Sequence, residues 1–438
     1  MTTALPDRVD VAIIGAGTAG AAAAAQCARE GLSVLCLDRG PLDRAGARWV
    51  NGVPAWSFAA AGFEPPEGDE LLGDGGPFHL IAGWGPRRLL IEHHGVLEVD
   101  MRALVERLHR RAREAGAILV GECATRGVDG SVLSTDRRPV HADVFVDASG
   151  LAGVRLLDSP RVSPKHLCAA AQEVRRLADP AGARAFFERI EVPLGQVACF
   201  AGVAGGYSIV NVRCHGDRVS ILTGTIPGDG HPSGKALLDR FATDQPWIGE
   251  PLFGGARAIP IRRPRDVIAA GRVAAIGDAA AQVFPAHGSG IGVGMIAARM
   301  LAMSIARGAG PEEYAVRWQR RWGGLMASYD LFRRFSQQLQ PGELEVMMDT
   351  GLMDPNLARA GMAQELPRPT PALIAGKTPA LARQPRLAAR LGAVALKMAA
   401  ARVLYSRYPT HASRLPAWSR RIASVFGEPP DLPQRARA

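Results

Sequence analysis

Short apolar runs alternate with stretches of helical periodicity in the first forty residues. Residues 9–14 (VDVAII) predict a short buried strand. Residues 19–30 are rich in alanine and predict a helix that ends at Gly31, since glycine is favoured just past helix C-termini. Residues 33–37 predict a second strand, with Asp38 at its end. This order indicates a strand–helix–strand unit with a parallel sheet.

Later segments repeat the mixture of strands and helices. Residues 95–116 predict a strand that enters an amphipathic helix, with Leu104, Leu108 and Ala112 on its apolar face. Polar and apolar residues alternate at 196–202, 207–213 and 218–225, which predicts antiparallel strands. From residue 311 onward the chain turns helical. The chain of 438 residues is long enough for two or three packed domains.

The turn between the first strand and helix carries the glycine spacing of a dinucleotide site. Gly15 permits a tight turn, Gly17 lets the backbone approach a pyrophosphate, and Gly20 lets helix and strand pack closely. The free N–H groups and dipole of the helix N-terminus attract phosphate. Asp38 is placed to accept hydrogen bonds from a ribose. The turn consists of Gly15, Ala16, Gly17, Thr18, Ala19 and Gly20.

A second glycine-rich turn lies far along the chain. Residues 271–295 read GRVAAIGDAAAQVFPAHGSGIGVGM, which resembles the GD motif of the FAD-dependent hydroxylase and reductase superfamily. The resemblance implies that Asp278 bonds the ribityl chain of the flavin and that residues 285–290 lie beside its ring. It also implies that the helix starting near Gly290 points its N-terminus at the flavin N1–C2 edge. Such a helix would stabilise the anionic reduced flavin.

A third segment, residues 142–150 (ADVFVDASG), resembles the superfamily segment between the two ends of the FAD. In related proteins an arginine near the start of the 95–116 helix approaches the flavin. Arg102 is the candidate here, one residue later than usual, and a solvated helix charge is the alternative. The resemblance implies these further cofactor-binding residues: Arg39, Arg48, Arg102, Asp147, Gly150, Gly277, Asp278, Pro285, Gly288, Ser289, Gly290 and Ile291.

We therefore expect an α/β fold. A Rossmann-like FAD-binding domain would comprise residues 1–165 and 262–329, with residues 41–99 contributing loops to the pocket. Residues 166–261 would form an inserted antiparallel β-sheet domain that binds the substrate. Residues 330–438 would form a C-terminal helical, basic region.

His287 is the candidate catalytic residue, because it lies inside the flavin loop and can act as acid, base or hydrogen-bond donor. The alternative is a loop histidine that contacts backbone or solvent. No metal-ligand cluster or Ser-His-Asp arrangement is legible in the sequence. We expect no metal.

Three branches of the superfamily offer different chemistries. The chain lacks the WxWxIP segment of flavin halogenases. It resembles prenyl (geranylgeranyl) reductases in DASG and in the GD motif, but it lacks their YxWxFPK-like segment; residues 205–212 (GGYSIVNV) are the nearest equivalent. Monooxygenases remain as the main interpretation. In that branch reduced FAD takes O2 to a flavin C4a-hydroperoxide, which hydroxylates an aromatic substrate. NADH, NADPH or a separate reductase would supply the electrons.

Two segments suggest a narrower assignment. Residues 47–56 (ARWVNGVPAW) and 350–367 (TGLMDPNLARAGMAQELP) are similar to flavoproteins that mature tryptophylquinone cofactors. The resemblance implies hydroxylation of a peptidyl tryptophan in another polypeptide. The alternatives are a flavin-dependent prenyl reductase acting on a lipid and a flavin-binding docking protein without turnover.

The charge is concentrated at one end. The formal net charge is +10, and from Arg368 onward 13 Lys and Arg residues face only two acids, Glu428 and Asp431. This basic region suits an acidic polypeptide substrate, an anionic membrane surface or plain solvent. We expect no nucleic-acid partner, because no module for one is visible. Six scattered cysteines, and no export signal or membrane span, predict a cytoplasmic protein without disulfides.

Overall fold

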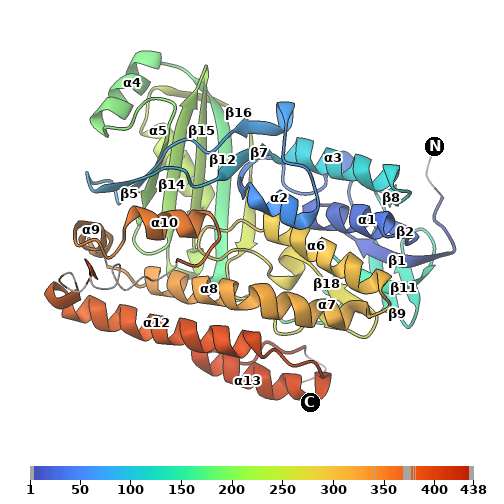
Figure 1. The fold of residues 1–438 in the computed structure, drawn as a ribbon. Helices are drawn as coiled ribbons and strands as arrows, with labels where there is room; N and C mark the ends of the chain where they lie inside the picture. The colour runs from blue at the N-terminus through green and yellow to red at the C-terminus, as the bar shows by residue number, and fades with distance from the viewer. Residues whose placement is uncertain (1–3, 341, 368–375, 378, 380, 434–438) are drawn as a thin grey trace.

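The computed structural model describes residues 4–340, 342–367, 376–377, 379 and 381–433. Three sheets and a set of C-terminal helices make up the fold (Figure 1). The first sheet has the order β17-β18-β11-β1-β2-β8, extended by β9 and β10. Its strands are β1 (Arg8–Ile14), β2 (Val34–Leu37), β8 (Ile118–Val120), β9 (Thr125–Asp129), β10 (Val132–Thr135), β11 (Val140–Asp147), β17 (Ala269–Ala270) and β18 (Val273–Ala275).

The strands at the centre of this sheet are parallel and buried on both faces. In β1, Val11 and Ile13 face the core shared with helices α1 (Thr18–Arg29), α3 (Met101–Glu114) and α6 (Ile291–Ala306). Ala12 and Ile14 face a second core, which β9 and β10 help to close. Burial on both faces explains why this strand is almost entirely apolar. The predicted strand–helix–strand unit is confirmed.

The second sheet is larger than the sequence indicated. Its order is β16-β12-β15-β14-β13-β5-β6. The strands are β5 (Phe78–Ala82), β6 (Arg88–Ile91), β12 (Leu167–Leu177), β13 (Val197–Ala201), β14 (Ser208–His215), β15 (Arg218–Thr225) and β16 (Ile248–Pro260). Helices α4 (Pro180–Arg189) and α5 (Gly234–Thr243) pack against it. Residues 41–99 therefore contribute two strands to this sheet, in addition to loops. They also supply β3 (Val50–Pro54), β4 (Leu71–Gly73) and β7 (Val96–Asp100), which form a third sheet, and helix α2 (Trp56–Ala61).

The C-terminal region is helical, as expected. Helix α7 (Gly310–Trp318) passes through a π-helical turn (Gln319–Gly323) into α8 (Gly324–Ser336) without a break. The expected boundary between residues 329 and 330 therefore falls inside α8, and helix rather than linker joins the two regions. The remaining helices are α9 (Glu343–Asp349), α10 (Pro355–Met362), α12 (Pro385–Ser406) and α13 (Leu415–Phe426). Figure 1 shows α12 and α13 as an outer layer beneath α7 and α8.

Buried ion pairs attach the end of the chain to the FAD-binding half. Glu428 accepts hydrogen bonds from Arg263, at 2.7 Å, and from Arg334 of α8, at 2.6 Å. Asp431 pairs with Arg262 and Arg265 at 3.0 Å each. The two acids of the basic region thus point into the protein, and they do not neutralise its surface.

The six cysteines are free and buried. Among the described residues, no group of three or more His, Cys, Asp or Glu side chains is arranged to hold a metal ion. Within the same part of the chain, no helix has the length and apolar character needed to cross a bilayer.

Candidate active site

The first glycine-rich turn is closed so tightly that it admits no side chain at two positions. Gly15 has a φ of +102°, and a Cβ built on it would lie 2.4 Å from the carbonyl oxygen of Ala148. A Cβ on Gly20 would lie 1.8 Å from the carbonyl oxygen of Gly15. The backbone N–H of Gly15 donates to the carbonyl oxygen of Leu37 at 2.7 Å. This bond ties the turn that follows β1 to the end of β2.

Asp38 lies at the end of β2, beside this turn. Its carboxylate accepts hydrogen bonds from the backbone N–H groups of Ala16 and Gly40, both at 2.9 Å. These bonds hold the carboxylate in place and leave lone pairs for a ribose. No side chain in the described part of the protein caps the N-terminus of α1, which begins after Gly17. Its N–H groups remain available for an anion.

His109 of α3 supports the same turn, and sequence analysis did not identify it. Its Nε2 lies 2.7 Å from the carbonyl oxygen of Ala16. Burial is the largest influence on this imidazole and lowers its pKa, so the ring is neutral at neutral pH. A neutral ring with a hydrogen on Nε2 can donate to Ala16. His109 follows Leu108 of the predicted apolar face, and this position was the available signal that it could be buried.

The second glycine-rich turn leads into α6. Two backbone hydrogen bonds of 2.9 Å hold the loop. The Phe284 N–H donates to the carbonyl oxygen of Ser289, and the Gly288 N–H donates to the carbonyl oxygen of Phe284. Asp278 lies close to the start of the helix, since a Cβ on Gly290 would be 3.5 Å from its Oδ1. Burial raises the pKa of Asp278 to about 6, and Arg257 opposes the increase. No side chain of a described residue caps the N-terminus of α6.

The two turns meet at the same place in the fold. A Cβ on Gly277 would lie 3.0 Å from the Cβ of Ala19, at the start of α1. Two uncapped helix N-termini and the carboxylates of Asp38 and Asp278 therefore surround one region. This donor and acceptor set fits FAD: α1 would bind the pyrophosphate, Asp38 the adenosine ribose, and Asp278 the ribityl chain. Bound FAD supplies two-electron redox chemistry.

Several residues predicted to bind the cofactor have other partners. The carboxylate of Asp147 accepts from the N–H of Ser149 at 3.1 Å, from its hydroxyl at 2.5 Å, and from Leu156 N–H at 3.0 Å. It shapes its own turn, in which Gly150 has a φ of +82°. The Ser289 hydroxyl donates to Gly52 at 3.1 Å, which ties the flavin loop to β3.

The three predicted arginines are not gathered at the turns. Arg102 donates to the Asp100 carboxylate at 2.6 Å and lies over the Phe253 ring at 5.1 Å. Arg48 donates to the carbonyl of Asp43, and Arg39 is exposed. A direct role of these side chains in binding FAD stays a prediction.

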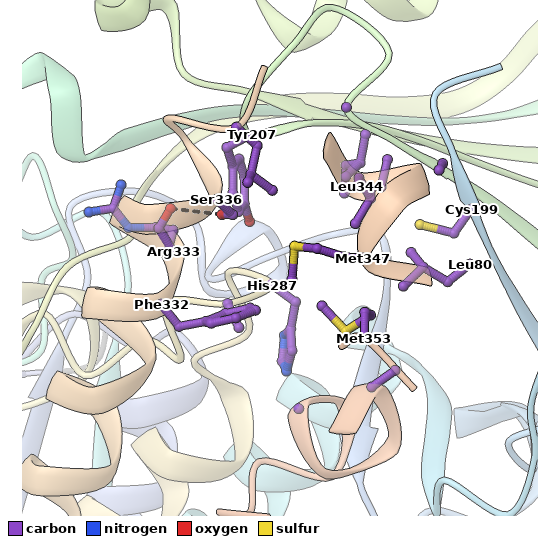
Figure 2. A pocket seen from close by; sticks show the side chains of 18 of the residues that line it. Leu80, Cys199, Tyr207, His287, Phe332, Arg333, Ser336, Leu344, Met347 and Met353 are labelled. Carbon is purple, nitrogen blue, oxygen red and sulfur yellow. Dashed lines mark hydrogen bonds between the residues drawn. The ribbon is translucent and has the colours of Figure 1, made fainter. Parts of the chain in front are cut away.

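A cavity of about 460 Å³ lies between the second sheet and helices α8 to α10 (Figure 2). Leu80 and Cys199 line it from the strands, and Phe332, Arg333 and Ser336 line it from α8. Its surface is mainly apolar, with Leu344, Met347, Met353, Leu357 and Met362 from the C-terminal region. The expected sheet is present beside the cavity, but it is mixed: β13 pairs with β5 in parallel, and its other pairs are antiparallel. The C-terminal helical region was not expected to line the cavity, and the methionine-rich run at 347–353 was the available signal.

His287 reaches this cavity from the flavin loop, together with Ala286 (Figure 2). Its side chain is exposed and borders the cavity, and its ring lies 4.9 Å from the ring of Phe284. The protein groups packed around this ring desolvate it and lower the pKa of His287 to about 4. The imidazole is therefore neutral at neutral pH, so it can accept or donate a hydrogen bond but holds no extra proton to give. Its catalytic role stays a prediction.

Comparison with known proteins identifies the N-terminal unit. Residues 10–75 match the family described as FAD dependent oxidoreductase. The chain is 27% identical to digeranylgeranylglycerophospholipid reductase of Sulfolobus acidocaldarius, over 96% of this chain and 98% of that protein. It is 26% identical to digeranylgeranylglycerophospholipid reductase 1 of Methanopyrus kandleri, over 72% of this chain and 85% of that protein.

Solved structures share the fold at low sequence identity. A geranylgeranyl bacteriochlorophyll reductase-like protein from Thermoplasma acidophilum superposes with a TM-score of 0.70 at 16% identity, covering 89% of this chain and 99% of that one. A halogenase in complex with FAD superposes with a TM-score of 0.61 at 16% identity, and the match covers 96% of each chain. The chain is an FAD-dependent oxidoreductase, and the proteins that it resembles include geranylgeranyl reductases and flavin halogenases.

Proposed function

We propose that this protein reduces carbon–carbon double bonds in the prenyl chain of a lipid. The apolar cavity carries the proposal, because its lining includes Ala286 and His287 of the flavin loop. A hydrocarbon chain in the cavity would therefore lie next to the cofactor. This proposal favours the reductase alternative over the hydroxylation of an aromatic ring.

The chemistry of the lining supports a hydrocarbon substrate. The lining surface is mainly apolar, with leucine, methionine, isoleucine and phenylalanine side chains in it, and the volume of about 460 Å³ lies within the usual range for ligand pockets, roughly 300–1,000 Å³. Polar side chains such as Tyr207, Asn211 and Arg333 also line the cavity, so it is the large apolar area that favours a hydrocarbon chain. One relative named as a digeranylgeranylglycerophospholipid reductase matches 96% of this chain, others of that name match 72–78% of it, and they support the same substrate class.

Reduction of an alkene requires a hydride and a proton. The reduced cofactor would supply the hydride, and we assign the proton to the Tyr207 hydroxyl, which lines the cavity. Burial raises the pKa of Tyr207, so the hydroxyl keeps its proton at neutral pH until a stronger base forms beside it. The His287 ring accepts a hydrogen bond from the Ser289 N–H at 3.4 Å, so it would help to hold the flavin loop in shape.

The test uses the FAD-loaded protein under anaerobic conditions. It would be reduced with NADH, NADPH or dithionite and mixed with a detergent-dispersed geranylgeranyl lipid. We expect flavin reoxidation and a mass gain of two hydrogens for each double bond. In Tyr207→Phe, lipid reduction should fall strongly while reduction of the flavin is unchanged. A flavin that is reoxidised only by oxygen, with no saturated lipid, contradicts the proposal.

A second candidate is the hydroxylation of a peptidyl tryptophan. One observation favours it: the two segments that resemble tryptophylquinone-maturing flavoproteins touch, because Trp56 donates a hydrogen bond to Ala363. This activity would use O2 and an acidic polypeptide docked on the basic C-terminal region. It predicts oxygen uptake that depends on the polypeptide, with a mass gain of one oxygen on its tryptophan.

A further inference from the structure

We propose that the outer face of α12 and the groove beside it form a docking surface for an anionic lipid bilayer. The inference rests on the proposed function in one respect, since an enzyme that reduces lipid chains must reach them in a membrane. The physical argument is separate, and it begins with the two apolar side chains that α12 exposes.

Leu396 is 75% exposed and Val403 is 51% exposed. They lie seven residues apart, two helical turns, and therefore share one face of α12. The opposite face packs on α8 and α13 through Leu387, Ala401 and Tyr405. Between the two exposed residues the outer face carries small residues such as Ala399 and Ala400. An exposed helix with this apolar stripe fits the interface of a bilayer, where it can lie in the plane of the membrane.

Cations flank the stripe on both sides. Lys397 lines a groove on one side of the helix, and Arg402 lines a different groove on the other. Long basic side chains of this kind bury their stems and keep their charge at the headgroups. Residues 366–427 contain eleven Lys and Arg and no Asp or Glu. Within the described part of this stretch, only Lys377 and Arg390 form ion pairs.

The groove on the Arg402 side has the side chains of a membrane interface. We call it the Trp groove; it has a volume of about 800 Å³ and is lined by Trp56, Arg320, Arg321, Trp322, Gly324, Leu325, Gln364, Glu365, Leu366, Ala399, Arg402, Val403 and Ser406. Trp56 and Trp322 stack with ring centroids 5.5 Å apart, and Arg321 lies over the Trp322 ring. Tryptophan is enriched at the headgroup level of membranes.

The Trp groove offers guanidinium groups to a lipid headgroup. Arg321 and Arg402 line it and are exposed, with one exposed acid, Glu365, beside them. Guanidinium groups bind phosphate esters through charge-assisted hydrogen bonds. Gln364 lies in the wall of the groove, where it is 1% exposed and neither atom of its side-chain amide has a hydrogen-bond partner among the described residues.

The docking surface is adjacent to the proposed substrate cavity. Met398 of α12 lines the cavity, while its neighbours Ala399, Arg402 and Val403 line the Trp groove. Residues 361–367 separate the two spaces, with Gly361 and Met362 on the cavity side and Gln364 on the groove side. A lipid held by its headgroup at the bilayer surface would therefore have its hydrocarbon chains close to the cavity.

The test measures vesicle binding by the FAD-loaded full chain. Vesicles of phosphatidylcholine alone would be compared with vesicles that also contain phosphatidylglycerol, by co-sedimentation at low and high salt. We expect binding to the anionic vesicles that weakens with salt. Lys397→Glu with Arg402→Glu should weaken it roughly thirtyfold. Leu396→Gln with Val403→Gln should weaken it roughly tenfold.

A matched control carries Arg184→Glu with Arg240→Glu. These exposed arginines are on α4 and α5, on the opposite side of the molecule from α12 (Figure 1). The control variant should lose only the part of its vesicle binding that depends on the net charge of the whole protein. Equal losses in the control and in the α12 charge variant overturn the proposal, and so does absence of vesicle binding by the wild type. Binding of polyglutamate without binding of vesicles would overturn it in favour of an acidic polypeptide.

The outcome is separable from the proposed function. Saturation of detergent-dispersed lipid without vesicle binding overturns the docking surface alone. Vesicle binding that depends on α12, without saturation of any prenyl lipid, overturns the reductase assignment alone.

Discussion

The indole nitrogen of Trp56 donates a hydrogen bond of 2.9 Å to the carbonyl oxygen of Ala363, 307 positions later in the chain. Trp56 begins α2 in the FAD-binding half, and Ala363 follows α10 in the C-terminal region. Ala363 is next to Met362, which lines the cavity. One side chain thus fixes part of the cavity wall to the half of the protein that surrounds the flavin.

Replacing Trp56 tests this attachment. Trp56→Phe keeps an aromatic ring against Trp322 but leaves the buried carbonyl of Ala363 without its donor. We expect the free energy of unfolding to fall by about 1–2 kcal/mol, the cost of an unpaired buried acceptor. Urea denaturation of the wild type and the variant measures this difference. Trp84→Phe is the matched replacement. The Trp84 indole is half-exposed and its nitrogen has no hydrogen-bond partner among the described residues, so this change should lower stability less. Equal effects of the two replacements would contradict the role of the Trp56 bond.

The first glycine-rich turn gives a prediction about the cofactor. In Gly20→Ala the new methyl group would lie 1.8 Å from the carbonyl oxygen of Gly15, so the turn must open. We expect the purified variant to lack flavin absorbance and to bind added FAD at least roughly a hundredfold more weakly, because the turn and the α1 N-terminus no longer present their N–H groups together. Gly76→Ala is the control, since a Cβ there meets nothing within 4 Å. A yellow Gly20→Ala protein with wild-type affinity would exclude this account of the turn.

The glycine-rich turns were predictable because their chemistry is local. Gly15, Gly20 and Asp38 lie within one strand–helix–strand unit, and the short-range geometry of that unit requires their residue types. The resemblance of residues 271–295 to the GD motif placed Asp278 and Gly290 between a strand and a helix, where the structure has them; their contact with FAD stays a prediction. Local patterns also predicted the antiparallel strands of the second sheet.

The cavity was not predictable in the same way, because its walls are brought together by contacts between distant segments. Leu80 lies in β5, which joins the second sheet by pairing with β13, more than a hundred residues later. Met347 and Met353 come from the C-terminal region, whose periodicity predicts helices but not the surface that they cover. Arg102, the candidate one residue later than the usual position, donates a hydrogen bond to the neighbouring Asp100 carboxylate.

The buried ion pairs predict a large effect of one carboxylate on stability. Glu428→Gln removes the charge that faces Arg263, which is fully buried, and Arg334. We expect a loss of about 3–5 kcal/mol in the free energy of unfolding, because a buried guanidinium is left without its full counter-charge. Glu250→Gln breaks an exposed pair with Arg176 and should change the free energy of unfolding much less, because solvent screens that pair. Thermal and urea unfolding measure both. A Glu428→Gln protein as stable as Glu250→Gln would show that the network contributes little.

His166 gives a prediction about pH. Burial is the largest cause that lowers its pKa to about 4, and Arg334 and Arg333 act in the same direction. Between this value and its ordinary pKa, near 6.5, the unfolded chain binds a proton at His166 that the folded protein does not bind. Stability is therefore lost as pH falls through this range, by about 2 kcal/mol between about pH 8 and pH 5. The His166→Gln variant lacks this titration. Between the same two pH values its free energy of unfolding, measured in urea, should fall by about 2 kcal/mol less than that of the wild type. Parallel pH profiles of the wild type and the variant would rule out this contribution.

The cavity gives a prediction that separates substrate binding from flavin chemistry. Met353 is buried and projects into the cavity (Figure 2). Met353→Trp would fill part of the volume of about 460 Å³ with a larger side chain. If a prenyl chain occupies this space, lipid reduction should fall at least roughly tenfold, because overpacking costs about 1–3 kcal/mol. Reduction of bound FAD by dithionite should be unchanged, since the residues assigned to the cofactor lie at the two glycine-rich turns. Leu194→Trp, at an exposed position, is the matched control and should leave both steps unaffected. The variant should discriminate most strongly against long prenyl chains and least against short ones, and a uniform loss across chain lengths would indicate a damaged fold instead of a filled cavity.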